Sequence, residues 1–211
     1  MSLPSFSTLP NLRVIRAASL RATPWKNGGG TTTEIAAAPP GASLDAFDWR
    51  VSMARVATDG PFSSFAGIDR TLAVVSGDGM ELAIEGCAIV MLGSHSAPLA
   101  FAGDVPTSAR LTAGAITDLN VMTRRGQFTH QMVRLAQPAS CELTPEIALA
   151  IVVAPTGGAT ISHDGAVATL DPGDAAIVDC SGDTRGTDVV LRITPDAGHA
   201  CYLVLLQPRR S

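Results

Sequence analysis

The chain has 211 residues, of which 46% are hydrophobic and 16% charged, and its formal net charge is -4 at pH 7. This length allows one large or two small domains with a buried core, and the composition argues against disorder. The only adjacent basic residues are the pairs Arg124-Arg125 and Arg209-Arg210, so the electrostatic footprint of a nucleic-acid-binding protein is missing. The longest apolar runs, such as 147–154, are too short to span a bilayer, and no membrane segment is expected.

The N-terminal stretch MSLPSFSTLPNLRVIR (1–16) has no basic start and no apolar core, and it contains two early prolines. It does not resemble a secretory signal, so a cytoplasmic location is expected. The four cysteines, Cys87, Cys141, Cys180 and Cys201, are widely separated and form no C-x-x-C pair. Reduced, packed thiols are the expected state in that compartment.

The stretch PWKNGGGTTTEIAAAPP (24–40) places Lys26 before three glycines. A phosphate-binding P-loop needs its lysine after the glycines, and the dinucleotide spacing fails because Thr33 stands three residues after Gly30. The threonines that follow are β-branched and predict a strand, so no helix dipole is available for a phosphate. The glycines indicate either a tight corner that enters the strand or a close approach to a ligand.

Short β-rich segments bounded by Gly, Pro, Asp and Asn recur along the chain, whereas helical periodicity is hard to find. They predict a nearly all-β protein with strands at 13–17, 31–36, 49–57, 71–76, 80–84, 88–92, 116–123, 127–135, 148–154, 160–163, 167–170, 175–179, 189–194 and 201–207. The connection DGPFSSFAGIDR (59–70) holds Phe62, Phe65 and Arg70. It is either a packed corner or a rim above the mouth of a pocket.

The second half of the chain echoes the first. LAVVSGDGMELAIEG, from Leu72, aligns with LAIVVAPTGGATISHDG, from Leu149, with two extra residues in the second copy, which predicts duplication of one β unit. The stretch 136–145 contains two prolines and is a candidate linker. We therefore expect a first barrel or sandwich over 1–136 and a smaller one over 137–211. The alternative is one core shared by both halves.

Three of the predicted strands each have one polar face. The simplest interpretation is that each polar face is solvated, as is common in antiparallel sheets. The alternative is that these faces line the interior of a barrel and orient a small ligand, where an arginine would bind a carboxylate through two parallel hydrogen bonds. The residues on the polar faces are Thr32 and Glu34, Arg50 and Ser52, and Asp118 and Asn120.

Motifs for metal or nucleophilic chemistry are missing. Pro172-Gly173-Asp174 resembles the proline-glycine turn of cupin barrels, but a cupin metal site needs clustered histidines. His95, His130, His163 and His199 are isolated, apart from the spacing of His199 and Cys201, so no metal or cofactor is expected. No G-x-S-x-G motif occurs, and the apolar surroundings of Cys87 and Cys201 favour inert thiols.

Five blocks, PWKNGGGTTTEIA, FDWRVSMARVATDGPFSSFAGIDR, GDGMEL, FAGD and TDLNVMTRRG, resemble the HutD/Ves family in their order and separations. The resemblance runs from about Trp25 to Arg134 and rests on the general β pattern beyond it. It implies an all-β fold of the RmlC-like cupin type with two β-barrel or jelly-roll units (a bicupin), no metal ligands and an association with histidine utilisation. It also implies a ligand pocket formed by Trp25, Lys26, Asn27, Glu34, Arg50, Ser52, Asp118 and Asn120, with Phe62, Phe65 and Arg70 as further members.

This resemblance and the missing catalytic motifs favour a non-catalytic protein that binds a small acidic metabolite, such as formylglutamate or urocanate, and limits pathway flux. The alternative is a metal-independent cupin isomerase or lyase that acts on a small carboxylate, with Glu34 and either Lys26 or His130 as an acid-base pair. A protein-interaction module is a weaker third hypothesis. Exposed sheet edges also leave open a homodimer formed by strand pairing.

Overall fold

The computed structural model describes residues 12–180 and 189–209. Within these ranges the chain forms 19 strands and one short 3-10 helix, which confirms the all-β prediction. No helix in the described ranges is long and apolar enough to cross a membrane. Most of the N-terminal stretch that was compared with a secretory signal, residues 1–11, and Arg210 of the second basic pair lie outside the described residues.

The N-terminal half contains eleven strands and the 3-10 helix in the described residues. They are β1 (Leu12–Ile15), the 3-10 helix (Ala17–Ser19), β2 (Ala22–Pro24), β3 (Gly30–Ala38), β4 (Trp49–Val56), β5 (Gly60–Pro61), β6 (Ile68–Ser76), β7 (Met80–Ile84), β8 (Val90–Leu92), β9 (Leu99–Ala102), β10 (Thr107–Leu111) and β11 (Ile116–Arg124). The C-terminal half contains β12 (Phe128–Leu135), β13 (Ala139–Leu143), β14 (Leu149–Val153), β15 (Ala159–His163), β16 (Ala166–Leu170), β17 (Ala175–Asp179), β18 (Val189–Pro195) and β19 (Cys201–Pro208).

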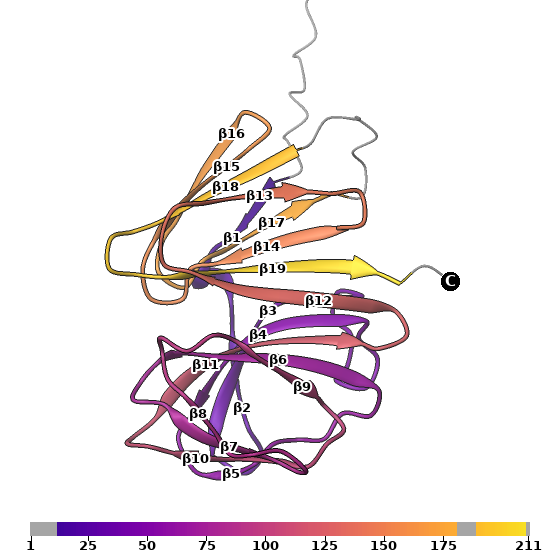
Figure 1. Cartoon of the computed structure of the whole chain (residues 1–211), viewed down its shortest axis with the longest axis vertical. Coiled ribbons are helices and arrows are strands. Elements are labelled where there is room, and N and C mark those ends of the chain that lie inside the picture. The colour runs from indigo at the N-terminus through magenta and orange to yellow at the C-terminus, as the bar shows by residue number, and fades with distance from the viewer. Residues whose placement is uncertain (1–11, 181–188, 210–211) are drawn as a thin grey trace, which may run out of the picture.

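These strands form four sheets, two large and two small. The first large sheet has the order β2-β3-β4-β11-β6-β9, and the first small sheet has the order β5-β10-β7-β8. The second large sheet has the order β1-β17-β14-β19-β12, and the second small sheet has the order β13-β18-β15-β16. Figure 1 shows two barrels, the first below and the second above, with β1 from the N-terminal end of the chain in the upper barrel.

The two barrels repeat the same strand order. The series β9-β6-β11-β4 of the first large sheet recurs as β17-β14-β19-β12, and β5-β10-β7-β8 recurs as β13-β18-β15-β16. Each strand of the second series stands eight places later in the chain than its counterpart in the first. This repetition supports the duplication that the sequence echo predicted, with β1, β2 and β3 as additions outside the repeated unit.

The strand pairing crosses the expected boundary after residue 136. β12 pairs with β19 from Phe128 to Leu135, so this strand belongs to the second large sheet, and β1 joins the other edge of that sheet by pairing with β17. The chain therefore passes from one barrel to the other in the turn between β11 and β12. The prediction of a linker over 136–145 is wrong, because residues 139–143 form β13 and pair with β18 despite the flanking prolines.

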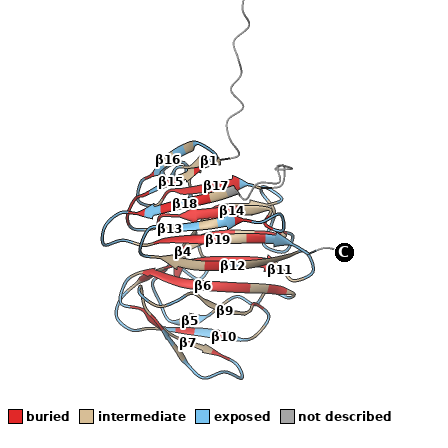
Figure 2. Cartoon of the chain, turned by 45° about the horizontal axis from the view of Figure 1, so that its top comes forward, coloured by how far each residue is buried: buried red, intermediate tan, exposed pale blue. Residues whose placement is uncertain are grey.

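The two large sheets face each other across a shared core, and buried strands gather at the centre of the molecule (Figure 2). Each barrel has a core between its own large and small sheets, and a third core, which we call the central core, joins the two large sheets. The central core includes Val51, Leu119 and Val121 from the first large sheet and Ile151, Tyr202 and Val204 from the second.

Strand alternation separates the two faces of the first large sheet. Val51 of β4 and Leu119 of β11 point into the central core, whereas Ser52 and Asn120, their neighbours in the chain, point into the first barrel. In β3, a register shift between Glu34 and Ala36 sends Ile35 into the central core. One face of the first large sheet therefore packs in the central core, and the other face lines the interior of the first barrel.

Candidate functional site

The interior of the first barrel holds a group of polar and charged side chains on the inward face of the first large sheet. Glu34 of β3 pairs with Ser52 of β4, which in turn pairs with Asn120 of β11. In the next row, Met122 of β11 pairs with Arg50 on one side and Arg70 on the other. We call this group the polar cluster, and its members are Glu34, Arg50, Ser52, Arg70, Asp118 and Asn120.

The polar cluster lies inside the barrel and not on a solvated outer face. Ser52, Arg70, Asp118 and Asn120 are all buried, and the apolar residues on the same face of these strands pack against the small sheet. The expectation of a simple solvated face is therefore wrong, because the first small sheet covers it. The structure brings six of the predicted pocket residues together from four strands, and a binding role for them stays a prediction.

The outer part of the polar cluster is an ion pair that reaches solvent. Arg50 donates from Nε to Glu34 Oε2 at 2.7 Å and from Nη1 to Ser52 Oγ at 3.2 Å. The Glu34 side chain is 40% exposed and the Arg50 side chain only 13%. The exposed carboxylate and the more deeply placed guanidinium thus connect the interior of the barrel to the surface.

The inner part is a buried chain of hydrogen bonds. Arg70 donates from Nη2 to Asn120 Oδ1 at 2.8 Å, and Asn120 donates from Nδ2 to Asp118 Oδ1 at 2.6 Å. Asp118 is 1% exposed, Asn120 6% and Arg70 7%, so this chain is almost fully shielded from water. Because a guanidinium can only donate, the bond from Arg70 fixes which end of the Asn120 amide faces Asp118.

Arg70 has unused donors despite its burial. Three phenylalanine rings surround its guanidinium, those of Phe62 at 5.0 Å, Phe65 at 5.9 Å and Phe101 at 5.3 Å from the guanidinium carbon to the ring centroid. Nη1 makes only a long contact of 3.5 Å with the Ser63 carbonyl oxygen, and Nε has no hydrogen-bond partner among the described residues. A buried donor without a partner costs about 1–3 kcal/mol, so Arg70 is a place where an added acceptor would stabilise the chain.

Burial changes the proton affinity of the two charged groups in this inner part. Burial raises the pKa of Asp118 to about 7, although the nearby Arg70 charge and the Asn120 hydrogen bond act in the opposite direction. Burial also lowers the pKa of Arg70 to about 10, with Asp118 opposing this change and the neighbouring Arg50 charge adding to it. Arg70 therefore stays charged at neutral pH, whereas Asp118 exchanges its proton in that range.

The loop with the three glycines forms a packed corner. Trp25 packs against the core of the first barrel and donates from Nε1 to Thr32 Oγ1 at 2.7 Å. A Cβ on Gly30 would collide with the Arg55 carbonyl oxygen and would lie 3.0 Å from the Trp25 ring, so glycine is needed for the close approach of the chain at this point. The interpretation as a tight corner thus accounts for the glycines.

Lys26 and Asn27 of this loop lie outside the polar cluster. Both residues are exposed, and the side chain of Asn27 accepts a hydrogen bond from the backbone of Gly29 at 3.1 Å. The structure therefore does not bring them together with Arg50 or Asp118, as the resemblance had implied for a common pocket. The Asn27 side chain stabilises the loop, and Lys26 is exposed to solvent.

His130 lies on the opposite side of the first large sheet from Glu34. Its ring nitrogens contact the hydroxyl groups of Thr71 at 2.8 Å and Thr123 at 2.7 Å, in the layer between the two large sheets. Burial lowers the pKa of His130 to about 4, so the ring is neutral at physiological pH. An acid-base pair of Glu34 with His130 is therefore wrong, because the sheet separates them, and exposed Lys26 does not join Glu34 in the polar cluster.

Phe101 is the main residue that the sequence prediction of the pocket missed. It belongs to β9, which pairs with β6 so that Phe101 stands opposite Arg70. The alternating pattern of Leu99 and Phe101 in LAFAG could have predicted this strand, but nothing local to the sequence shows that it lies beside β6.

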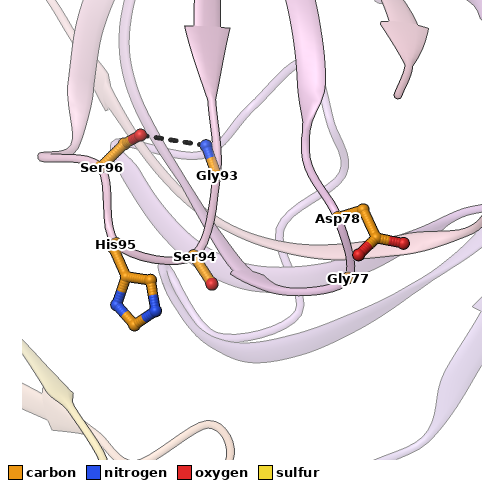
Figure 3. A pocket seen from close by; sticks show the side chains of 6 residues that line it. All are labelled: Gly77, Asp78, Gly93, Ser94, His95 and Ser96. Atoms are coloured by element: carbon orange, nitrogen blue, oxygen red, sulfur yellow. Dashed lines mark hydrogen bonds between the residues drawn. The ribbon is translucent and has the colours of Figure 1, made fainter. Parts of the chain in front are cut away.

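An open hollow lies at the turns of the first barrel (Figure 3). It has a volume of about 500 Å³ and is lined by Gly77, Asp78, Gly93, Ser94, His95 and Ser96. Asp78 comes from one turn, whereas His95 and Ser96 come from another. Arg134 of β12 contacts the second turn, since it donates to the Ser94 carbonyl oxygen at 3.1 Å. Among the described residues, no group of three or more His, Cys, Asp or Glu side chains could hold a metal ion.

Comparison with known proteins places the chain in a family. The family model named HutD matches residues 17–192. The chain belongs to the HutD family. An uncharacterised 21.2 kDa protein from the hutC 3' region of Pseudomonas putida is 41% identical over 120 residues, which are 54% of this chain and 59% of that relative. Protein Ves of Citrobacter koseri is 42% identical over 103 residues, 48% of this chain and 52% of Ves. The chain thus spans little more than half the length of these two relatives.

Solved structures agree with this assignment. HutD from Pseudomonas fluorescens SBW25 has a TM-score of 0.78 and 29% identity, and the match covers 94% of this chain and 100% of that one. A cupin 2 conserved barrel domain protein from Leptotrichia buccalis shows the shared fold, with a TM-score of 0.51 and 11% identity over 93% and 96% of the two chains. The chain therefore has the RmlC-like cupin fold of jelly-roll type, and the names of its relatives link the HutD family to the histidine-utilisation locus.

Proposed function

We propose that this HutD-family chain binds a small acidic metabolite of histidine utilisation in the first barrel and limits pathway flux by binding it. The main support is Arg70, a buried cation whose Nε finds no hydrogen-bond partner in the part of the chain that the structure describes. A planar guanidinium binds a carboxylate through two parallel hydrogen bonds, and these bonds are strengthened where water is excluded. The carboxylate of the metabolite would supply the acceptor that Arg70 lacks.

Two further features support an organic anion as the ligand. Phe62, Phe65 and Phe101 give the surroundings of Arg70 an apolar wall, and a small number of placed polar groups within apolar walls is typical of metabolite sites. Arg50 provides a second cation nearer the surface. Formylglutamate, with two carboxylates, and urocanate, with one, are the candidate ligands.

Isothermal titration calorimetry with formylglutamate and urocanate tests this proposal. We expect the wild-type chain to bind at least one of them, and Arg70→Lys to weaken binding by about 10- to 100-fold because lysine keeps the charge but cannot form the two-pronged contact. Arg110→Ala is the matched control, because this arginine is exposed on the outside of the same barrel and should leave the affinity unchanged. The proposal is wrong if the wild type binds neither anion or if Arg70→Lys binds as well as the wild type.

One observation favours a second candidate, a metal-independent isomerase or lyase that acts on a small carboxylate. The carboxyl group of Asp118 exchanges its proton near neutral pH, as a general acid or base does. If the chain is such an enzyme, incubation with each anion should yield a product of changed structure by mass spectrometry, and Asp118→Asn should abolish it. Unchanged anions after prolonged incubation would exclude turnover of these two compounds and favour a binding role.

A further inference from the structure

The charge inside the first barrel depends on one carboxyl group. Arg50 is neutralised by its contact with Glu34, so the remaining interior charges are those of Arg70 and Asp118. The interior is therefore neutral when Asp118 is ionised and carries one net positive charge when Asp118 holds its proton. The groups that face Asp118 from neighbouring strands are Arg70 of β6 and, further out, Arg50 of β4 with Glu34 of β3.

The opposite wall of the barrel adds no charge to this balance among the described residues. The first small sheet contributes Met80, Leu82 and Ala109 to the core of the barrel, and the Glu81–Arg110 ion pair of that sheet is largely exposed. An apolar wall keeps the local dielectric low, so the single charge of Asp118 has a large effect on any anion that enters.

The hydrogen bonds allow Asp118 to take up a proton without rearrangement. Asn120 donates to Oδ1 of Asp118, and a carboxyl oxygen accepts this bond whether the group is ionised or protonated. Because Oδ1 is the atom that accepts this bond, the proton can reside on Oδ2. Arg70 donates to the other end of the Asn120 amide, so protonation of Asp118 requires no change in that contact.

We propose that anion binding in the first barrel is coupled to the uptake of one proton from solvent by Asp118, so that the site binds its carboxylate ligand in the protonated form and releases it as the pH rises. This inference rests on the proposed function, because it concerns the same site. A carboxylate on Arg70 would lie near Asp118, separated from it by the Asn120 amide, and two like charges in an apolar interior disfavour each other. The pKa of about 7 for Asp118 in the empty site places this exchange in the physiological range.

Calorimetry of the full chain between pH 6 and pH 9, with formylglutamate and with formate as the simplest carboxylate, tests the coupling. Both ligands stay ionised over this range because carboxyl groups titrate near pH 4, so a change in affinity reports on the protein. We expect the affinity to fall by about tenfold for each pH unit above 7. Titrations in two buffers of different ionisation enthalpy should show uptake of about one proton at pH 8.

Asp118→Asn mimics the protonated form, and it should bind with the low-pH affinity of the wild type at every pH and take up no proton. Glu81→Gln removes a carboxylate from the outer wall of the same barrel and should behave as the wild type. A wild-type affinity that is constant from pH 6 to pH 9, with no proton uptake, would overturn the inference while leaving the proposed binding function intact. Absence of binding at every pH would instead overturn the proposed function. Because proton uptake is measured on the wild type, the test does not depend on whether Asp118→Asn folds.

Discussion

The two barrels share a strand order but differ in what fills them. In the first barrel, β11 presents Asp118 and Asn120 to the interior, whereas the corresponding strand of the second barrel, β19, presents Leu203 and Leu205. The core of the second barrel consists of residues such as Ile161, Leu191 and Ile193. Replacing a buried ion pair by apolar side chains is often neutral or stabilising, so a stable barrel does not need the charges that the first barrel keeps. The comparison shows that the buried charges of the first barrel are not required by the strand order that the two barrels share, and this agrees with the binding role that we propose for the first barrel.

The largest loss of stability is expected when the apolar interior of the second barrel receives a charge. Leu203→Asp would place a carboxylate among the apolar side chains of the second barrel, and we expect a loss of about 4–5 kcal/mol of unfolding free energy. Urea denaturation monitored by circular dichroism measures it. Leu44→Asp, at a position that is 52% exposed, is the control and should cost little. Tolerance of Leu203→Asp would mean that the second interior accepts charge as readily as the first.

Removal of the cation from the first barrel should have the next largest effect. Arg70→Met keeps much of the side-chain volume but leaves ionised Asp118 without its nearby positive charge at pH 8, and we expect a destabilisation of about 3 kcal/mol. The double variant Arg70→Met/Asp118→Asn should recover part of this loss, because the unpaired charge is then also gone. Denaturation of the wild type, Arg70→Met, Asp118→Asn and the double variant at pH 8 gives the coupling energy. A change in the double variant that equals the sum of the two single changes would show that the two groups act independently.

A smaller effect is expected in the pH dependence of the unfolding free energy, which Asp118 of the first barrel influences. Folded Asp118 keeps its proton up to about pH 7, whereas the same group in an unfolded chain releases it near pH 4. The folded state therefore binds more protons between these values, and Asp118 lowers the stability of the wild type as the pH rises from about 4 to about 7. Asp118→Asn cannot titrate, so it should be more stable than the wild type by about 1–3 kcal/mol at pH 8 and lose this advantage at pH 4. Unfolding free energies at the two pH values provide the check, and parallel curves would contradict the prediction.

The smallest expected effect concerns the glycine loop. Lys26 is exposed and lies outside the polar cluster, so Lys26→Ala should change the affinity for formylglutamate by less than about twofold. Calorimetry of Lys26→Ala, in parallel with Arg70→Lys, measures this affinity. A large loss of affinity in Lys26→Ala would move the ligand from the interior of the barrel to its rim.

Local patterns in the sequence predicted the faces of the strands well. Alternation separated Arg50 and Ser52 from Val51, and Asp118 and Asn120 from their apolar neighbours, because the period of a strand is fixed by the backbone. Alternation does not show whether water or another sheet lies against each face. Whether the polar face met water or a small sheet depended on pairings between distant segments, and the sequence left both alternatives open.

Short strands and register were harder to predict. β5 has two residues, and β13 lies between prolines, so neither has a recognisable period. The echo of Leu72 by Leu149 identified corresponding strands, but Leu72 points into the first barrel whereas Leu149 packs against the central core. A shift of one residue exchanges the faces of a strand, so a sequence alignment with two inserted residues could not fix which side chains correspond.

The central core makes each half of the molecule dependent on the other. The first large sheet carries the polar cluster on one face and contributes Val51, Leu119 and Val121 to the central core from the other. A fragment that ended after β11 would expose these residues as one broad apolar surface, and it would be prone to aggregate for that reason. The C-terminal barrel therefore shields the reverse side of the sheet that carries the polar cluster, and ligand studies need the intact polypeptide.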